Sequence, residues 1–470
     1  MTTQQKRAIP FIALIILGAV AIRVWASFNE LWIDEIWSLG FASEIKSPLD
    51  VFTIHHDNNH YLNTLYMWIV GQGQHFFIYR IISLISGTAL IIIASLISLR
   101  RNVADGIITA ILLGYSYIFI LYTANARGFM PMLLFGYLSY LSLEKYLKKP
   151  ALTYAILFGI TASLAFLWHL TYLFLYLPLL VWTLYSLVDM KTKSLLHLVQ
   201  LHILPFLLLK ILYILDFQYM QVGGGSPTFM RELFASTISA TIGTPETGLL
   251  SVIAIGIVLL VIIKVIIHFH DRNFGMFLFL TILFLGTTIG VVFAGMVMKS
   301  GFFFFPRYFL PCAFAFLIIV SALLAHCYSK GGFRRAICIL SIIIFFSGNI
   351  PNVLNVVRRG KEGTYFPVIN YLETRTQEPT ITFGSNRDSR TTLITQYYFK
   401  LYNVEKTYEY IAAEDFTKNP SEWYFYERQD VGWKDPPPPY LSIKDSNEVY
   451  TLQEDAPHKD TFWILYRRTN

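Results

Sequence analysis

Long runs of uncharged apolar residues constrain this 470-residue chain more than any other feature of its sequence. A run of roughly 18 such residues predicts a transmembrane helix, because about 20 residues cross the hydrocarbon layer of a bilayer. Hydrophobic residues make up 55% of the chain and charged residues 14%, which excludes a soluble domain of this length. The runs predict about eleven spans: 8–26, 76–98, 105–123, 130–147, 152–169, 171–188, 196–216, 248–268, 274–298, 308–328 and 336–356.

The positions of lysine and arginine predict the side of the membrane on which each loop lies. Basic residues gather in every second loop, and cytoplasmic loops carry such an excess. The extracytoplasmic side then receives residues 27–75, 123–129, 217–247, 299–307 and everything after 356. We therefore expect a multi-pass protein of the inner (cytoplasmic) membrane. The basic loops contain Lys6, Arg7, Arg100, Arg101, Lys145, Lys148, Lys149, Lys191, Lys193, Arg272, Lys330, Arg334 and Arg335.

The net charge of +7 comes from the membrane part of the chain. Residues 1–356 carry 22 basic and 13 acidic side chains, whereas residues 357–470 carry 15 and 17. The basic residues form no clustered face, so we expect the lipid bilayer and no nucleic acid as a partner. The three cysteines all lie in or beside apolar segments, without a disulfide framework or zinc-ligand spacing.

Two domains are predicted: a transmembrane domain at 1–356, with external loops 27–75 and 217–247, and a small extracytoplasmic α/β domain at 357–470. Within the second domain, residues 367–374 and 388–401 have helical patterns. Residues 380–384, 407–411, 423–427 and 462–466 have the composition of strands. Pro436–Pro439 forms a rigid polyproline stretch.

The segment that follows the first span holds two adjacent acids, Asp34 and Glu35, between Trp32 and Trp37. Tryptophan is common at the membrane interface, so the aromatic residues alone indicate little. A carboxylate beside apolar walls is costly to ionise, which raises its pKa and suits it to proton abstraction. The pair is a candidate catalytic site, and the alternative is a solvated turn.

Further external residues strengthen this interpretation. His60 and Tyr61 precede residues 62–71, which are too few to span a membrane and predict an interfacial helix. Three arginines, Arg80, Arg127 and Arg307, lie at the external ends of spans, against the usual bias. Arginines at such positions need an anionic partner, either protein carboxylates or the phosphate of a ligand.

The order of these motifs resembles that of the GT-C membrane glycosyltransferases. The Asp-Glu pair follows the first helix, and His60 leads through Leu65-Tyr66 to an arginine-containing second helix. Ala126-Arg127-Gly128 closes the third helix, and Pro306-Arg307-Tyr308-Phe309-Leu310-Pro311 opens a late one. The chain resembles most the bacterial branch related to dolichyl-phosphate-mannose protein mannosyltransferases, which includes the aminoarabinose transferase of lipid A. The resemblance extends over roughly residues 10–330 and implies an all-α membrane fold of the GT-C type.

This resemblance implies an inverting transfer of a sugar from a polyprenyl-phosphate-linked donor to an extracytoplasmic acceptor, which could be a protein, a lipid or a glycan. Asp34 would be the catalytic base with Glu35 beside it. Arg307, Arg127, Lys299 and Arg80 would bind the donor phosphate, and His60, Tyr61, Asn125 and Tyr308 the substrates. No cofactor is implied. The chain departs from the family pattern at Asn125, where many relatives have an acid, and at Tyr61-Leu62-Asn63, where a double proline is usual.

Simpler interpretations exist for other polar residues. His169, His197, His202, His268 and His326 lie in or beside predicted helices and are expected to pack or face the interface. The spacing of His55, His56, Asp57 and His60 fits no established metal site, so a divalent metal is not indicated. Lys210 and Asp216 fall on one predicted helix and could pair.

A secondary transporter is the main alternative function, and a flippase of lipid-linked saccharides or a non-catalytic assembly component is another. Transport sites commonly lie near the middle of the bilayer between inverted repeats. In this chain the conspicuous charges belong to one external rim, and no internal repeat is detected. The charge distribution therefore favours a transferase.

Overall fold

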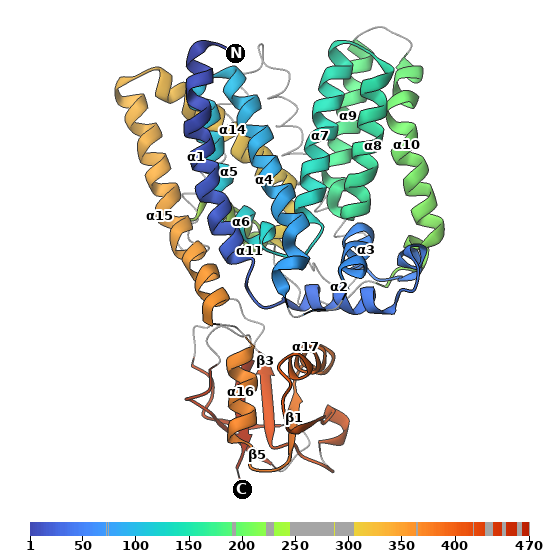
Figure 1. The fold of residues 1–470 in the computed structure, drawn as a ribbon, viewed down its shortest axis with the longest axis vertical. Coiled ribbons are helices and arrows are strands. Elements are labelled where there is room, and N and C mark those ends of the chain that lie inside the picture. The colour runs from blue at the N-terminus through green and yellow to red at the C-terminus, as the bar shows by residue number, and fades with distance from the viewer. Residues whose placement is uncertain are drawn as a thin grey trace. The chain divides into compact units, whose positions relative to one another are not determined.

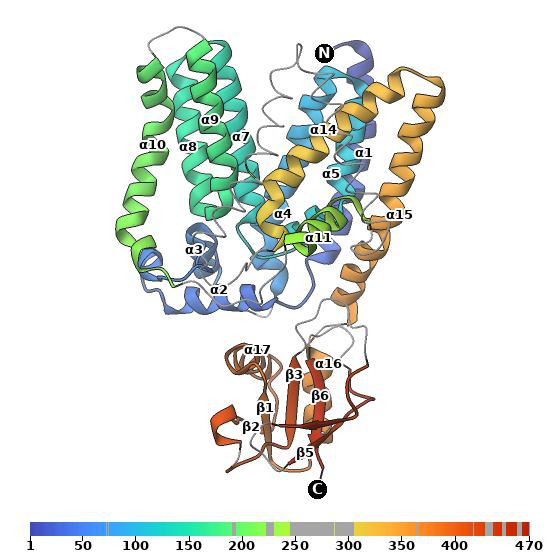
Figure 2. The same cartoon turned by 180° about the vertical axis from the view of Figure 1, so that it is seen from behind.

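The fold is described from a computed structural model, shown in Figures 1 and 2. The described residues are 1–71, 73, 75–189, 194–221, 230–244, 286, 305–362, 365–416, 418–427, 436–443, 448–457 and 463–469. Contacts between residues divide the chain into two compact units. The membrane unit contains residues 1–27, 41–72 and 77–356, and the C-terminal unit contains residues 28–40, 73–76 and 357–470. This division differs from a single cut at residue 356, because residues 28–40 and 73–76 group with the tail.

The helices as far as residue 362 are α1 (Thr3–Ala26), α2 (Ile33–Glu44), α3 (Tyr61–Val70), α4 (Phe76–Arg101), α5 (Val103–Tyr115), α6 (Tyr117–Thr123), α7 (Phe129–Lys148), α8 (Leu152–Trp168), α9 (Leu173–Asp189), α10 (Ser194–Leu215), α11 (Met230–Ile242), α14 (Leu310–Ser329) and α15 (Gly332–Glu362). Short 3-10 turns lie at Pro48–Thr53, Leu170–Tyr172, Phe217–Tyr219 and Pro306–Phe309.

Nine of the predicted spans fall on described residues, and each coincides with a helix or, at 105–123, with the bent pair α5 and α6. Within these residues, six helices are long and apolar enough to cross a membrane, or seven if the bent pair is one span. The protein is therefore a helical multi-pass membrane protein. The predicted spans 248–268 and 274–298 lie outside the described residues, so the total of eleven stays a prediction.

The membrane unit is held by extensive helix packing. The pairs α7 with α8, α5 with α14, α1 with α5, and α8 with α10 have the most extensive contacts. Both views show α7, α8, α9 and α10 side by side, in green in Figure 1. Leucine, alanine, phenylalanine and tyrosine side chains from most of these helices form one large buried cluster.

The bend between α5 and α6, 60° in size, leaves backbone groups without helical partners. Arg23, fully buried near the end of α1, donates from Nη1 to the Gly114 carbonyl at 2.5 Å and from Nη2 to the Leu113 carbonyl at 2.9 Å. At the start of α6, the Tyr117 amide donates to Asn349 Oδ1 of α15 at 2.7 Å. Side chains from α1 and α15 thus satisfy the polar groups that the bend exposes.

The C-terminal unit contains a mixed six-stranded sheet with the order β2-β1-β3-β6-β5-β4. Strands β2, β1 and β3 are parallel, and the remaining neighbours are antiparallel. Figure 2 shows β2, β1, β3 and β6 side by side. The elements are α16 (Phe366–Arg375), β1 (Thr380–Ser385), α17 (Asp388–Leu401), β2 (Thr407–Tyr410), β3 (Trp423–Glu427), β4 (Tyr440–Ser442), β5 (Val449–Leu452) and β6 (Trp463–Arg468).

Alternating aromatic residues explain how this sheet is covered, because successive side chains of a strand point to opposite faces. Phe425 of β3 packs against Phe383 and Trp463, with ring centroids 5.7 and 4.7 Å apart, on the face that α16 and α17 cover. Tyr424, its neighbour, belongs to the core of the other face with Tyr450. The two helices and four strands predicted for the tail are confirmed, whereas β4 and β5 were not predicted.

Candidate active site

Arg127 lies just before α7 and is buried, with 5% of its surface exposed. Its Nη2 atom lies 2.7 Å from Asn58 Oδ1 and 2.6 Å from His60 Nε2. Because arginine can only donate hydrogen bonds, His60 Nε2 is the acceptor, and the proton of the neutral imidazole lies on Nδ1. Within the described residues, His60 Nδ1 has no hydrogen-bond partner. Arg127 therefore sets the tautomer of His60.

The backbone around Arg127 is held by three other helices. Asn63 Nδ2 of α3 donates to the Ala126 carbonyl at 3.2 Å, and Ser83 Oγ of α4 donates to the Arg127 carbonyl at 2.8 Å. A Cβ atom on Gly128 would lie 1.9 Å from the Trp168 carbonyl oxygen at the end of α8. Such close backbone approach requires a glycine, which accounts for Ala126-Arg127-Gly128 as a unit.

His169, directly after α8, stacks on His60 with the ring centroids 3.9 Å apart. The Thr171 amide donates to His169 Nδ1 at 3.1 Å, so the ring proton lies on Nε2, which has no hydrogen-bond partner within the described residues. Burial, the neighbouring His169 and the charges of Arg127 and Arg307 hold the pKa of His60 well below 6.5. Burial and the same two arginines hold the pKa of His169 well below 6.5. Two neutral imidazoles thus lie in the field of two cations.

Arg307 belongs to the short turn Pro306–Phe309 that leads into α14. Its guanidinium carbon lies 4.2 Å from the Phe305 ring centroid and 5.5 Å from that of Tyr308. Stacking on aromatic faces orients the planar guanidinium group. Lys299, the neighbouring predicted phosphate ligand, lies outside the described residues.

The remaining predicted residues of the membrane unit have structural partners. Arg80, 1% exposed, donates from Nη1 to the Ser27 carbonyl at 3.0 Å, which fixes the end of α1. Tyr61, also 1% exposed, donates its hydroxyl to Asp216 Oδ2 at 2.5 Å. Asn125 is half-buried in the turn before Arg127, and its carbonyl accepts the Arg127 amide at 2.9 Å.

Asp34 and Glu35 lie in the first turn of α2, within the C-terminal unit. Glu35 is fully buried, and its Oε2 accepts the Trp32 amide at 2.7 Å, an interaction that caps the start of the helix. Asp34 is half-buried, and its backbone carbonyl accepts the Ser38 hydroxyl at 3.0 Å. The two adjacent carboxylates therefore differ in environment, because one caps the helix and the other is partly exposed.

Two similar solved structures come from one protein. No family model and no curated protein match the sequence. The crystal structure of ArnT from Cupriavidus metallidurans in the apo state is similar, with a TM-score of 0.52 and 12% identity, over 90% of this chain and 93% of that chain. The fold is ArnT-like. Its undecaprenyl phosphate-bound crystal structure is equally similar, with a TM-score of 0.52 and 11% identity, over 89% and 93% of the chains.

ArnT is a GT-C aminoarabinose transferase, so the expected resemblance to this family is confirmed at the level of the fold. The ArnT-like helices of this chain bring together residues that motif order did not connect. His169 was expected to pack or face the interface, yet its ring stacks directly on His60. No local sequence signal identifies this contact, because it depends on the packing of the end of α8 beside Gly128.

The acidic and histidine residues of the first external loop point to different partners in this ArnT-like fold. His55 Nδ1 pairs with Asp216 Oδ1 at 2.9 Å, His56 with Asp57 at 3.0 Å, and His60 with Arg127. The partners of the buried Asp216 carboxylate are His55 and Tyr61, one at each oxygen, and not Lys210, with which it could have paired. Within the described part of the chain, no group of three histidine, cysteine, aspartate or glutamate side chains could hold a metal ion.

Proposed function

We propose that this protein is a membrane glycosyltransferase that moves a sugar from a polyprenyl-phosphate-linked donor to an extracytoplasmic acceptor. One observation carries the proposal: the buried Arg127 donates to His60 Nε2 at 2.6 Å beside the stacked ring of His169, and the charge of Arg307 also lowers the pKa of both histidines. Because both imidazoles are uncharged, the positive charge of this site comes from the two arginines alone. Such a site suits a phosphate, which arginine binds through two parallel N–H···O bonds.

The proposed reaction forms a bond between an acceptor oxygen or nitrogen and the anomeric carbon of the sugar. The bond between that carbon and the phosphate oxygen breaks, and polyprenyl phosphate leaves with the bonding electron pair. The acceptor's proton passes to the base. Arg127 and Arg307 stabilise the negative charge that develops on the phosphate. Attack from the face opposite the phosphate inverts the anomeric centre.

We assign the base to Asp34 and a positioning role to Glu35. The Glu35 carboxylate is fully buried and accepts the Trp32 amide, so its geometry is already used to begin α2. Asp34 is partly exposed in the same turn. Proton abstraction requires a carboxylate that the acceptor can reach, and the partial exposure of Asp34 meets this requirement better than the full burial of Glu35.

The neighbouring hydroxyl and imidazole donors fit the polar parts of a sugar phosphate. We assign His60, through Nδ1–H, and Tyr308 to substrate binding, and Arg80 and Lys299 to the phosphate region. We also assign Asn125, two residues before Arg127, to substrate binding. Tyr61 is assigned to the same region, where its hydroxyl donates to Asp216.

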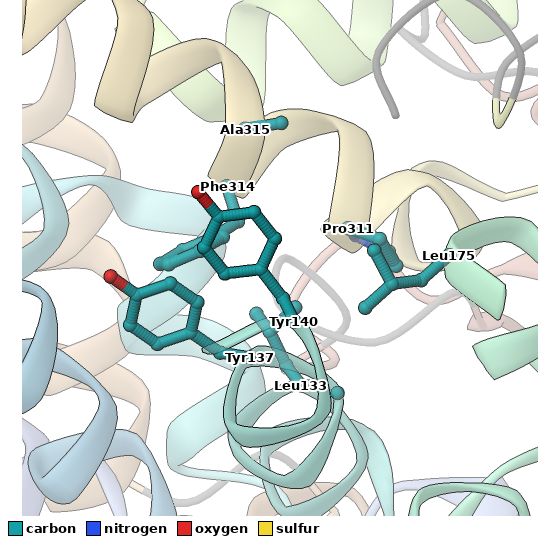
Figure 3. Close-up of a pocket in the computed structure, with 8 residues that line it drawn as sticks. Leu133, Tyr137, Tyr140, Leu175, Pro311, Phe314 and Ala315 are labelled. Carbon is teal, nitrogen blue, oxygen red and sulfur yellow. The ribbon is translucent and has the colours of Figure 1, made fainter. Parts of the chain in front are cut away.

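A small apolar pocket lies among α7, α9 and α14. Figure 3 shows Leu133, Tyr137, Tyr140, Leu175, Pro311, Phe314 and Ala315 around it. Pro311, which lines this pocket, follows Arg307 by four residues. The proposed phosphate ligand and the apolar surface therefore belong to neighbouring turns of the chain. We propose that the apolar helix surface around this pocket contacts isoprene units of the donor.

We place the active site and the C-terminal domain on the extracytoplasmic side of the inner membrane. The basic loops define the cytoplasmic side, and residues 27–75, Arg127, Arg307 and the tail all belong to the opposite set of loops. The acceptor is therefore a protein, lipid or glycan of the cell envelope.

The test uses purified protein in lipid nanodiscs with a panel of undecaprenyl-phosphate-linked sugars and a cell-envelope extract as acceptor. The expected result is loss of one donor, release of undecaprenyl phosphate and labelling of an envelope molecule. The Asp34→Asn protein should leave every donor intact. Movement of a donor across liposomes without cleavage of its sugar–phosphate bond would instead establish a flippase.

A further inference from the structure

Residues 28–40, which carry Asp34, belong to the same compact unit as the C-terminal domain. Glu30 makes the closest connections. Its Oε2 accepts the Tyr365 amide at 2.5 Å, and its Oε1 accepts the Phe366 amide at 2.9 Å. These amides are the N-cap and the first residue of α16. Glu30 thus caps a helix of the C-terminal domain from a distant part of the chain, where a negative charge is favourable.

A second set of contacts comes from α17. The Tyr402 hydroxyl donates to Glu30 Oε1, and the fully buried Tyr398 donates its hydroxyl to the Leu31 carbonyl at 2.8 Å. Tyr398 stacks between Tyr365 and Tyr402, with ring centroids 4.8 and 5.6 Å apart. The two hydroxyls are therefore held in place by a rigid aromatic stack.

These bonds end three residues before Asp34. Tyr398 fixes the Leu31 carbonyl, and Glu35 fixes the next residue by accepting the Trp32 amide at 2.7 Å. Leu31 is itself fully buried. The peptide group between Leu31 and Trp32, directly before α2, is thus restrained at both its carbonyl and its amide, and Asp34 lies in the turn that follows.

We infer that the C-terminal domain positions the catalytic acid, with Glu30, Tyr398 and Tyr402 acting as positioning residues for Asp34. This inference rests on the proposed transferase function. A base acts only within hydrogen-bond reach of the proton that it removes, and a displacement of about 1 Å can reduce the rate about a hundredfold. The C-terminal domain therefore contributes to turnover by restraining residues 30–32, although residues 357–470 contain no proposed catalytic residue.

The test compares Tyr402→Phe with Tyr410→Phe in the full-length protein. Both substitutions remove a tyrosine–carboxylate hydrogen bond of the C-terminal unit, the first to Glu30 and the second to Asp388. Only the first bond involves the segment that carries Asp34. Glu30→Gln and Tyr398→Phe extend the series to the α16 cap and to the Leu31 carbonyl.

Two quantities are measured: the kinetics of sugar transfer and the hydrogen–deuterium exchange of peptides from residues 28–40. We expect Tyr402→Phe, Tyr398→Phe and Glu30→Gln each to lower kcat about tenfold, with the donor KM within about twofold, and to speed exchange in residues 28–40. Tyr410→Phe should match the wild type in both. Faster exchange confined to residues 28–40 identifies positioning, because a general loss of folded protein would lower apparent kcat with KM unchanged but would not change exchange in this segment alone.

The outcomes separate the two hypotheses. If wild-type protein transfers sugar and the three variants retain kcat, the positioning role is wrong even where exchange increases. If the variants and Tyr410→Phe lose the same activity, the effect is one of domain stability and the inference is also overturned. If the wild type cleaves no polyprenyl-phosphate donor, the proposed function is wrong and the inference that rests on it is withdrawn.

Discussion

The side chains of Arg127 and His60, 67 residues apart in the sequence, meet with 2.6 Å between Nη2 and Nε2. The arginine donates, so the imidazole is held neutral and in a single tautomer. His169 stacks on the other side of this contact, at 3.9 Å between ring centroids. Three segments thus supply one site: the loop before α3 provides His60, the turn before α7 provides Arg127, and the end of α8 provides His169.

Stability should decrease in mild acid because of the two histidines. Their pKa values in the native protein lie well below 6.5, whereas in the unfolded chain they are near 6.5. Below about pH 6.5 the unfolded chain binds protons that the native protein does not, so each histidine lowers the free energy of unfolding by about 1.4 kcal/mol per pH unit. Above that pH neither residue contributes to a pH dependence.

Thermal denaturation of detergent-solubilised protein between pH 5 and 8 measures this effect. We expect a constant midpoint above about pH 7 and a steady fall below about pH 6.5. His169→Phe keeps a ring that can stack and removes one titrating group, so its slope below about pH 6.5 should be shallower. Identical slopes for the two proteins would contradict the lowered pKa of His169 in the native protein.

Arg307→Lys should weaken binding of undecaprenyl phosphate tens- to a hundredfold. Lysine keeps the charge and loses the planar fork that binds two phosphate oxygens, a loss of about 2–3 kcal/mol. Arg335→Lys is the matched control, because Arg335 also lies over an aromatic ring, that of Tyr328 at 4.9 Å, in a predicted cytoplasmic loop. Titration of the lipid into nanodiscs measures both. Equal affinity for the two variants would mean that Arg307 does not bind the phosphate, and the site would be assigned to Arg127, Arg80 or Lys299.

Asp34→Asn should lower kcat by about 10²–10⁴-fold and leave binding of undecaprenyl phosphate unchanged, because general-base catalysis contributes about this much. Glu35→Gln should act differently. It removes the charge that caps α2, so we expect about 0.5–1 kcal/mol of lost stability and a smaller loss of kcat. A larger loss of kcat in Glu35→Gln than in Asp34→Asn would mean that Glu35 is the base and Asp34 the positioning residue.

Gly128→Ala should disrupt the Arg127 site through the backbone. The added Cβ would lie 1.9 Å from the Trp168 carbonyl oxygen, so α7 and α8 must separate, at a cost of about 1–3 kcal/mol. The variant should unfold at a lower temperature and bind undecaprenyl phosphate more weakly. Gly40→Ala, where a Cβ would meet nothing within 4 Å, is the control and should be neutral or slightly stabilising. Wild-type affinity in Gly128→Ala would mean that Arg127 does not bind the phosphate.

A periplasmic location of the tail can be tested with reporters fused after Asn470. Alkaline phosphatase, which needs an oxidising compartment, should be active there, and a reporter that folds only in the cytoplasm should not. The opposite pattern would contradict the odd number of spans on which the predicted sidedness depends.

The amino-acid sequence by itself determined where the long apolar helices lie within the described residues of the membrane unit, whereas α2 and α11 were not predicted. A hydrocarbon layer demands an uninterrupted apolar length, so α1, α4 and α14 are visible as local runs. The two helices and four of the strands of the tail follow equally local periods. The motif at Ala126-Arg127-Gly128 was visible in the same way, as a short string at the end of a span.

Only the tertiary structure decided which of these residues meet. The stacking of His169 on His60, the bonds of Asp216 to His55 and Tyr61, and the cap that Glu30 places on α16 each join distant segments. Strands β4 and β5 are defined by their pairing with each other and with β6, contacts that their own short sequences do not record. Local periodicity reports the face that a residue presents, whereas long-range contacts depend on how helices pack, and packing is distributed over many side chains that no short motif records.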